Sequence, residues 1–379
     1  MADFDVIIIG AGSIGVPTAM FVAQKGYSGL VLDKNPGPGQ GMNSRAIGGI
    51  RATHSSLAKA ALAQESMEIY SSWQAETGDD IGWFQGGYLF PAYSEDTAGN
   101  LRAIEGDLKE RGYDVSWLDP ESMETIFPWI ETNELVGGLH SPSDGRGNPK
   151  LTNAAFYEEC LNLGVQFNFN ETVQEIVTNS HHIESTVTNV GNYSSNFVIN
   201  AAGPLAKKVG EMLNVKIPIT LEPHTAGRVT VSPLQSVNPL VIDLRPSSGT
   251  AMFYFFQDME GNFVFTIDPD RPVGDPKMLA GIVAERMQMA FQDTLDVKLG
   301  DYWSGVYPMT PDGAPIIDSV PRFDNFIIAA GMGGQGFMLG PGVGALIARM
   351  ISGTLTPADE EILPEFALGR NYQNSEILK

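Results

Sequence analysis

The hydrophobic pattern at the start of the chain is that of a β-α-β unit. Residues 4–9 (FDVIII) form a continuous apolar run, which is typical of a strand buried on both faces of a parallel sheet. A glycine-rich turn follows at 10–15, and residues 16–25 then have a helical pattern that ends at Gly26. Residues 29–33 (GLVLD) predict a second buried strand, which ends on an acidic residue.

The rest of the chain alternates between helical and strand-rich segments. Helical patterns are found at 57–76, 97–111, 151–163, 276–293 and 341–352. Strands are predicted at 165–169, 172–178 and 183–189, and buried strands that run into glycines at 197–203 and 325–330. Residues 217–268 are rich in strand signals, with Met252, Tyr254 and Phe256 on one face of a strand and Phe253 and Phe255 on the other.

Segments of the nucleotide-binding type therefore lie at the start, in the middle and at the end of the chain. This order predicts a mixed fold, α/β and α+β, in which a discontinuous Rossmann-like domain carries an inserted antiparallel-sheet domain. We expect residues 1–85, 148–216 and 321–379 to form the dinucleotide-binding domain, and residues 86–147 and 217–320 to form the substrate-binding domain. A length of 379 residues agrees with two domains.

Composition and charge narrow the function classes. Hydrophobic residues make up 43% of the chain and charged residues 18%, which is a globular balance. The formal charge of −22 repels nucleic-acid phosphates and anionic lipid, so we expect no nucleic-acid partner. The N-terminus lacks the basic start of a signal peptide, and no run of about 18 apolar residues occurs. We therefore expect no membrane span and a cytoplasmic protein.

Cysteine and histidine usage argues against metal chemistry. Cys160 is the single cysteine, which excludes an internal disulfide, a cysteine-based zinc site and a Cys-ligated iron–sulfur cluster within the chain. It lies in a helix-like stretch, where we expect a small buried apolar residue. The five histidines show no ligand spacing apart from the pair His181-His182, which falls on a predicted loop or strand edge. We predict no metal site.

The turn GAGSIG meets the conditions of a dinucleotide-binding fingerprint, since it follows a strand and opens a helix. Gly10 permits the tight turn, Gly12 lets the backbone approach a pyrophosphate, and Gly15 allows the helix and strand to pack closely. The pyrophosphate is expected over the helix N-terminus. Asp33 lies 18 residues after Gly15, where it is expected to accept hydrogen bonds from the ribose hydroxyls and to disfavour NADP.

Two further glycine segments favour FAD over NAD. Residues 331–337 (GMGGQGF) follow a buried strand and precede the last predicted helix. A flavin needs a site of this kind at its N1–C2=O edge, because reduction places negative charge there. The turn Ala201-Ala202-Gly203 provides a third close approach of the backbone. Each turn alone is weak evidence, and together they predict FAD.

With these motifs the chain resembles the FAD-dependent amino-acid oxidoreductases of the D-amino-acid oxidase superfamily. The pattern is most similar to the sarcosine oxidase and L-proline dehydrogenase β-subunit branch, with glycine oxidase as a cousin. The resemblance rests on five ordered blocks: VIIIGAGSIG at the start, SRAIGGIR at 44–51, VINAAG at 198–203, GVYPMTPDGAPIID at 305–318 and FIIAAGMGGQGFMLGPGVG at 326–344.

The glycine turns and the resemblance together give a predicted cofactor-binding set. In relatives of this kind, the block that matches 44–49 wraps the flavin and pyrophosphate, and a strand residue that matches Val173 contacts adenine through its backbone. The predicted set is Gly10, Gly12, Ser13, Ile14, Gly15, Asp33, Lys34, Ser44, Arg45, Gly48, Gly49, Val173, Ala202, Gly203, Gly331, Gly333, Gly334, Gln335, Gly336, Phe337 and Met338.

The resemblance also implies a catalytic site made of Arg51, Tyr254 and Tyr307. The position that matches Arg51 holds the substrate carboxylate in such relatives, and a guanidinium is the best bidentate partner of a carboxylate. A structural salt bridge is the alternative for Arg51, and a buried structural role is the alternative for both tyrosines. His54 is expected on the surface or behind the residues that touch the substrate. The sequence leaves open whether His224 faces the substrate.

Two departures from the family pattern bear on substrate and acceptor. The chain has Gln335 where the familiar block has histidine, and Met338 where some sarcosine oxidases have lysine, which resembles the proline dehydrogenase type. Monomeric sarcosine oxidases also place a lysine over the flavin from a substrate-domain strand, whereas residues 217–276 contain no lysine. The pattern therefore favours a dehydrogenase over an oxidase.

The predicted function is FAD-dependent oxidation of the C–N bond of a small amino acid, or of an N-alkyl or secondary amino acid of the sarcosine, proline or glycine type, by hydride transfer to flavin N5. Electrons would then pass to oxygen or to a redox partner. The sequence leaves the oligomeric state open, with a homo-oligomer and a subunit of a complex among the alternatives. The alternatives are a FAD-bearing accessory or assembly protein without amine oxidase activity of its own, and the same scaffold acting on an opine or hydroxy acid.

Overall fold

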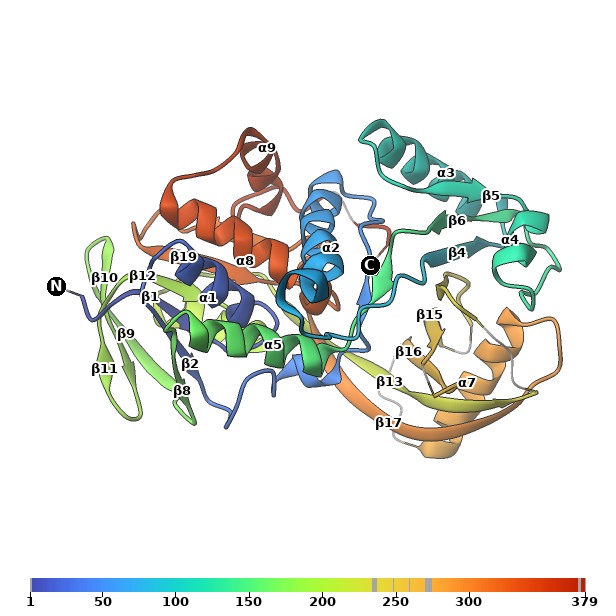
Figure 1. Ribbon diagram of the computed structural model, residues 1–379, viewed down its shortest axis with the longest axis horizontal. Helices are drawn as coiled ribbons and strands as arrows, with labels where there is room; N and C mark the ends of the chain where they lie inside the picture. The colour runs from blue at the N-terminus through green and yellow to red at the C-terminus, as the bar shows by residue number, and fades with distance from the viewer. Residues whose placement is uncertain are drawn as a thin grey trace.

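The computed structural model describes residues 2–233, 237–247, 249–258, 260–269, 275–373 and 376–378. The chain forms two parts, each built around one large sheet, and Figure 1 shows the two parts side by side. Helices pack on both sheets, so the mixed fold expected from the sequence is confirmed.

The first large sheet has six strands in the order β18-β19-β12-β1-β2-β8. The strands from β19 to β8 run parallel, and β18 is antiparallel to β19. The β1 side chains of Val6, Ile7 and Ile8 are completely buried, because β1 has a strand on each side and both faces of the sheet are covered. The bounds are Phe4–Ile9 for β1, Gly29–Asp33 for β2, Gln166–Phe169 for β8, Ser195–Asn200 for β12, Ile316–Ser319 for β18 and Phe326–Ala330 for β19.

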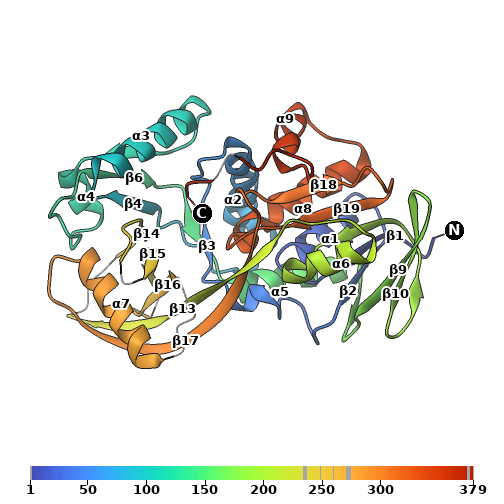
Figure 2. The ribbon, with the colours of Figure 1, turned by 180° about the vertical axis from the view of Figure 1, so that it is seen from behind.

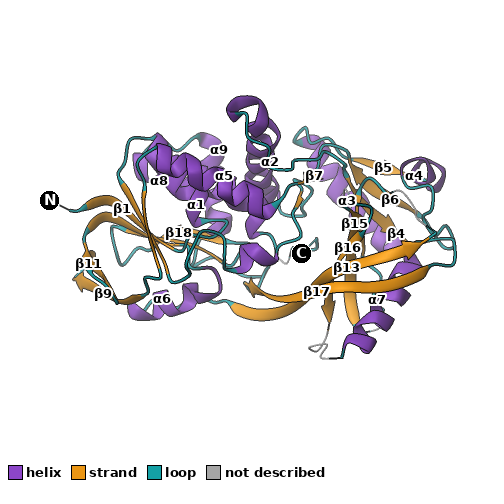
Figure 3. Ribbon diagram, turned by 60° about the horizontal axis from the view of Figure 1, so that its bottom comes forward, coloured by secondary structure: helices purple, strands orange, loops and turns teal. Residues whose placement is uncertain are grey.

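Figure 3 shows α1 (Gly15–Gln24), α5 (Pro149–Asn162) and α8 (Gly336–Ser352) on one side of this sheet and α6 (Ala206–Met212) on the other. The side of α6 also carries a small antiparallel sheet of β9 (Val173–Asn179), β10 (His182–Thr188) and β11 (Asn192–Tyr193). Further helices are α2 (Leu57–Thr77), which packs on α8, and α9 (Pro357–Phe366). Two short 3-10 turns, η1 (Met42–Arg45) and η2 (Gly203–Leu205), lie in the loops.

Glycines let α8 approach its neighbours backbone to backbone. A Cβ atom at Gly340 would lie 2.0 Å from the carbonyl oxygen of Ser13, and one at Gly344 would lie 2.7 Å from the carbonyl carbon of Pro17 in α1. A Cβ atom at Gly342 would lie 2.3 Å from the carbonyl oxygen of Leu62 in α2. These distances are far below van der Waals contact, so no larger residue fits between the three helices as they are packed.

Helix α8 begins at Gly336, five residues before the predicted start at Pro341. Proline has no N–H for the carbonyl four residues earlier, which normally disfavours a helix interior. Here that carbonyl belongs to Phe337, and it accepts a hydrogen bond of 2.6 Å from the hydroxyl of Tyr70 in α2. This long-range donor replaces the missing one, and the helix continues through Pro341.

The second large sheet has eight strands in the order β17-β13-β16-β15-β14-β4-β6-β5. Phe253 and Phe255 belong to the cluster under α4 and α7, whereas Tyr254 and Phe256 pack with residues of α3 on the opposite face, as the alternation predicts. The bounds are β4 Tyr88–Ala92, β5 Ser116–Leu118, β6 Gly137–Ser141, β13 Thr220–Ser232, β14 Leu240–Asp243, β15 Thr250–Gln257, β16 Phe263–Pro269, β17 Asp296–Met309, α3 Glu95–Glu110, α4 Pro120–Ile126 and α7 Pro276–Ala290.

The long strands β13 and β17 connect the two parts of the molecule. They pair antiparallel from Thr220 opposite Met309 to Ser232 opposite Asp296. Figures 1 and 2 show both strands running from the middle of the molecule to the far end of the eight-stranded sheet. A two-stranded sheet of β3 (Gly49–Ile50) and β7 (Gly145–Arg146) also lies in this region.

The two large sheets take their strands from interleaved segments of the chain, which supports the predicted division into domains. That division stays a prediction. One strand lies on the other side of a predicted boundary. The residues of β18 fall in the segment 217–320 that is assigned to the substrate-binding domain, and yet β18 belongs to the six-stranded sheet. Its place follows from the hairpin that it forms with β19, in which Ile316 lies opposite Ala330.

Cys160 is free and completely buried in the helix-covered face of the six-stranded sheet, as predicted.

Within the described part of the chain, no single helix is long and apolar enough to cross a membrane. Helices α8 and α9 reach the required length and apolar composition only when taken together, and the pair is bent by 109°.

Candidate functional site

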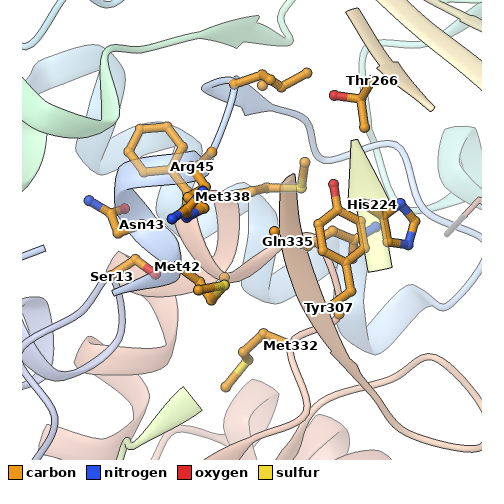
Figure 4. Close-up of a pocket in the computed structure, with 18 of the residues that line it drawn as sticks. Ser13, Met42, Asn43, Arg45, His224, Thr266, Tyr307, Met332, Gln335 and Met338 are labelled. Atoms are coloured by element: carbon orange, nitrogen blue, oxygen red, sulfur yellow. The ribbon is translucent and has the colours of Figure 1, made fainter. Parts of the chain in front are cut away.

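A pocket lies where the two parts of the molecule meet (Figure 4). Its walls come from the loop around η1, from the glycine turn that precedes α8, and from strands β13 to β17. The predicted site residues that line it are Ser13, Ile14, Arg45, Gly48, Gly49, Arg51, Gly203, Tyr254, Tyr307, Gly331, Gly333, Gly334, Gln335, Gly336, Phe337 and Met338. The predicted residues outside this lining are Gly10, Gly12, Gly15, Asp33, Lys34, Ser44, Val173 and Ala202.

The first glycine turn has the geometry of a cradle. Gly10 has a φ of +112°, and a Cβ atom there would lie 2.5 Å from the carbonyl oxygen of Ala201. A Cβ atom at Gly15 would lie 1.8 Å from the carbonyl oxygen of Gly10. At Gly12, by contrast, no atom lies within 4 Å of the added Cβ. Two glycines therefore serve the packing of the turn, and Gly12 leaves the open space that a pyrophosphate needs.

Asp33 lies at the end of β2, beside this turn. One carboxylate oxygen accepts a hydrogen bond of 2.7 Å from the N–H of Ala11, and the other accepts one of 2.8 Å from the N–H of Asn35. The carboxylate therefore holds the glycine turn against the end of β2. Its predicted contact with a ribose stays a prediction, as do the roles of the exposed Lys34 and of Val173 at the start of β9.

Two helix N-termini converge beside the pocket. Neither α1 nor α8 has a side-chain cap, so N–H groups of their first turns lack intrahelical partners. A Cβ atom at Gly336 would lie 3.3 Å from the hydroxyl of Ser13, which shows how near the two helix starts lie. The positive ends of two helix dipoles therefore point into one region, an arrangement that suits an anionic group.

The second glycine turn is joined directly to β17. Gly331 and Gly333 have positive φ values of +71° and +57°. A Cβ atom at Gly334 would lie 2.2 Å from the ring of Tyr307, so the ring packs directly against the turn. The N–H of Gly333 also donates a hydrogen bond of 3.1 Å to the carbonyl of Pro308.

One wall of the pocket is a row of paired residues that runs across five strands of the eight-stranded sheet. The side chains of five paired residues all line the pocket: Ile242 on β14, Tyr254 on β15, Thr266 on β16, Ala226 on β13 and Trp303 on β17. They are register partners, so they project from the same face of the sheet. The wall is therefore mostly apolar, with hydroxyl groups at Tyr254 and Thr266.

Four buried polar atoms that face this pocket have no hydrogen-bond partner in the described structure. They are Asn43 Oδ1, Gln335 Oε1, His224 Nδ1 and Thr266 Oγ1. A buried polar atom without a partner is costly, and such atoms are rare in folded proteins. A polar ligand in this pocket would offer them partners, and the oxygens of Asn43 and Gln335 fit a cofactor that lies on their side of the pocket.

His224 and Tyr307 stack on each other, with ring centroids 3.6 Å apart and an interplanar angle of 17°. Burial lowers the pKa of His224 to about 4 and raises the pKa of Tyr307 to about 12. Burial also raises the pKa of Tyr254 above its usual range. All three side chains are therefore neutral at physiological pH. Figure 4 shows the stacked pair on one side of the pocket, with Asn43, Arg45 and Met42 on the other.

Arg51 lines the pocket but is only 2% exposed. Its Nη1 donates to the carbonyl of Thr53 and lies 3.1 Å from His54 Nδ1, and its Nη2 donates a 2.5 Å hydrogen bond to the carbonyl of Leu378. Among the described residues it forms no ion pair with an acid, so the salt bridge weighed as an alternative is not found. Its role as the carboxylate ligand stays a prediction.

His54 is completely buried, so the expectation of a surface position is wrong and the position behind Arg51 is the one observed. Burial first, and then the nearby charges of Arg51 and Lys59, hold the pKa of His54 well below its ordinary value. His182 Nδ1 lies 2.7 Å from a carboxylate oxygen of Asp324, within hydrogen-bond distance. In the described ranges no cluster of histidine, cysteine or acidic side chains has the geometry of a metal site.

Sequence reasoning missed Asn43, Thr266 and the segment Glu376–Leu378. Asn43 lies in the glycine-rich loop at 34–50, where its type gave no signal of its own. Thr266 faces the pocket because of the register of β16, which depends on pairing with distant strands. The segment Glu376–Leu378 has no motif, and its contact with Arg51 spans more than 300 residues of chain.

Comparison with known proteins gives a consistent picture. The sequence model of the family of FAD dependent oxidoreductases matches residues 5–350. A D-amino acid dehydrogenase of Neisseria meningitidis is 26% identical over 310 residues, which cover 77% of this chain and 70% of that protein. Mouse mitochondrial sarcosine dehydrogenase is 26% identical over 371 residues, which cover 92% of this chain and 39% of that protein. The crystal structure of L-proline dehydrogenase from P. horikoshii superimposes with a TM-score of 0.86 at 24% identity, covering 96% of each chain.

Two of the three glycines in the first turn, Gly12 and Gly15, give a matched test. We expect Gly15→Ala to lower the thermal unfolding temperature of the protein without FAD, because its Cβ overlaps the carbonyl of Gly10. We expect Gly12→Ala to leave that temperature unchanged and to raise the FAD dissociation constant about tenfold or more, equivalent to about 1.4 kcal/mol. Unfolding followed by circular dichroism and FAD titration by fluorescence quenching measure the two effects. Unchanged FAD affinity in Gly12→Ala would remove the turn from the binding site.

Proposed function

The chain belongs to the family of FAD-dependent oxidoreductases, and from this premise we propose that it oxidises the C–N bond of a small amino acid. The substrate class proposed is a primary, N-alkyl or secondary amino acid of the glycine, sarcosine or proline type. The observation that carries the proposal is the charge of the pocket: its described lining contains Arg45 and Arg51 and no acidic residue.

The proposed FAD site uses the two glycine turns and the loop between them. The first turn and Asp33 would hold the adenosine and pyrophosphate, and residues 44–49 with the turn at 331–338 would hold the flavin end. When bound, FAD supplies the two-electron oxidation. The N-termini of α1 and α8 offer N–H groups to the negative charge of such a ligand, and the unpartnered oxygens of Asn43 and Gln335 offer acceptors.

Arg51 is proposed to bind the substrate carboxylate. Two of its nitrogens are held by the carbonyls of Thr53 and Leu378, whereas its Nε–H has no partner within the described residues. The fixed guanidinium would present this edge to the pocket. A substrate whose carboxylate is held in one place is bound with its reacting C–H bond in a fixed orientation, and such orientation is a main source of rate enhancement.

The remaining pocket walls suit a neutral amine. An ammonium group would be repelled by two arginines and would find no carboxylate in the described lining. The polar atoms that the walls offer are the neutral His224, Tyr254, Tyr307 and Thr266. A site of this kind lowers the cost of losing the amine proton, so the nitrogen lone pair becomes available as the adjacent C–H bond is broken.

A dehydrogenase is favoured over an oxidase. Residues 217–276 contain no lysine, and the described pocket lining contains none either. A lysine ammonium over a reduced flavin would help oxygen to accept electrons, so the lack of a lysine in the described lining favours transfer to a redox partner. The same site with a different substrate, such as an opine or a hydroxy acid, and an accessory protein without activity of its own are the competing outcomes of the test.

The test is anaerobic reduction of the purified flavoprotein. Sarcosine, L-proline, glycine, dimethylglycine and D-alanine are added in turn while the flavin absorbance near 450 nm is followed, at about millimolar concentrations typical of amino-acid substrates. Bleaching by one of these amines supports the proposal, and slow recovery in air supports a dehydrogenase. A flavoprotein that none of them reduces, and that a hydroxy acid or an opine does, would overturn the amino-acid assignment.

Removal of the guanidinium gives the first prediction for this site. We expect Arg51→Ala to raise KM for the reactive amino acid about 100-fold, since a hydrogen bond to a charged group contributes about 1.5–3 kcal/mol. FAD content is expected to stay unchanged. Arg111→Ala, which removes an exposed arginine paired with Glu361, is the control and should leave KM unchanged. Equal KM values for Arg51→Ala and the native protein would exclude the proposed role.

The pH dependence gives the second prediction. Three pocket residues stay neutral between about pH 5 and pH 10: His224, whose pKa is about 4, Tyr307, whose pKa is about 12, and Tyr254, whose pKa is raised by burial. We therefore expect kcat/KM to rise with pH as the free substrate amine loses its proton. Two substrates whose amines differ in pKa should give profiles displaced by that difference. Profiles that coincide for the two substrates would show that a protein group titrates instead.

A further inference from the structure

The segment Glu376–Leu378 touches two residues of the pocket. The carbonyl oxygen of Leu378 accepts hydrogen bonds from Arg51 Nη2 at 2.5 Å and from Gln335 Nε2 at 3.4 Å. The Leu378 side chain is 1% exposed and packs in the cluster of β4 and α3. Figures 1 and 2 show the segment beside α2, between the two parts of the molecule.

Glu376 anchors this segment at the start of α2. Its carboxylate accepts hydrogen bonds from the N–H and hydroxyl of Ser55, at 2.9 and 2.5 Å, and from the N–H of Ser56 at 3.2 Å. It also accepts one of 3.0 Å from the N–H of Leu378. The Glu376 N–H in turn donates to the carbonyl of Asp312 at 2.8 Å. The segment is therefore tied to α2 and to the chain that leads into β18.

The anchor includes a buried charge pair. Lys59 Nζ lies 3.8 Å from Glu376 Oε2, with both side chains 1% exposed, and it donates to the carbonyl of Gly313 at 3.1 Å. The desolvation of two buried charges offsets much of their attraction, so such a pair contributes little net stability compared with apolar residues of the same size. What this pair does specify is position, because each charge needs its partner and its hydrogen bonds in place.

By holding the Leu378 carbonyl in place, this anchor also fixes the position of the Arg51 guanidinium. An arginine side chain has several rotatable bonds, and its orientation in a pocket depends on the groups that accept from it. For Arg51 these are the carbonyls of Thr53, in the same loop, and of Leu378, more than 300 residues later. The Leu378 carbonyl also takes the Nε2 side of the Gln335 amide, which leaves Oε1 of Gln335 without a partner.

We propose that Leu378 and Glu376 are positioning residues of the substrate site: the Leu378 carbonyl sets the plane of Arg51 for the substrate carboxylate, and Glu376 holds that carbonyl in place. This inference rests on the proposed function of Arg51. It predicts that the segment controls affinity for carboxylates and has little effect on the oxidation step or on FAD binding.

The test uses Glu376→Gln in the full-length flavoprotein, with ligand binding followed by the change in the flavin spectrum. The probes are tetrahydrofuran-2-carboxylate, which keeps a carboxylate but has no amine to oxidise, and tetrahydrofurfuryl alcohol, which has the same ring without the carboxylate. We expect the dissociation constant of the carboxylate to rise about tenfold, which is about 1.4 kcal/mol. We expect the alcohol to bind as it does to the native protein, and kcat for the reactive amino acid to change less than twofold.

Ile377→Ala is the matched control, because Ile377 lies in the same segment with half of its surface exposed. It should leave both dissociation constants unchanged. If Glu376→Gln does not fold, a chain shortened after residue 373 replaces it, with the same expected loss of carboxylate affinity. An equal loss for both probes, or no loss for the carboxylate, would overturn the inference. If the native flavoprotein itself binds no carboxylate and is reduced by no amine, the proposed function fails instead.

Discussion

Contact between backbones at glycine positions is the constraint on which the rest of the structure depends. Gly10 and Gly15 bring the first turn against Ala201 and the end of β1, while Gly340 and Gly344 bring α8 against α1. These contacts join the beginning, the middle and the end of the chain within a few ångströms. Because each of them leaves no room for a side chain, the helices pack closely on one another, with the starts of α1 and α8 next to each other.

The charge of the pocket lining is opposite in sign to the net charge of the whole protein. The chain carries a formal charge of −22, and yet the described lining of the pocket contains two arginines and no acid. Burial keeps the other titratable groups of the lining neutral, through a low pKa at His224 and raised pKa values at the tyrosines. The described lining therefore presents positively charged and neutral polar groups to whatever occupies the pocket.

The sequence was informative wherever a residue type is required by local geometry. Gly10, Gly12 and Gly15 follow a strand and open a helix, so their turn could be read directly, and the apolar run of β1 predicted a strand buried on both faces. It was uninformative where position depends on distant partners. Thr266 faces the pocket through strand register, α8 continues through Pro341 because of the Tyr70 hydroxyl, and Leu378 reaches Arg51 across the whole chain. Such contacts follow from tertiary packing, which local periodicity does not encode.

The hydrogen bond from the N–H of Gly333 to the carbonyl of Pro308 bears on how a substrate enters. It links the end of β17 in one part of the molecule to the glycine turn of the other, and the ring of Tyr307 is pressed against that turn beside it. A hinge that swung the two parts open at this place would have to break the link and separate the ring from the turn. Such an opening would cost both contacts, whereas the exposed side chains of Met42 and Arg45 border the cavity at its rim.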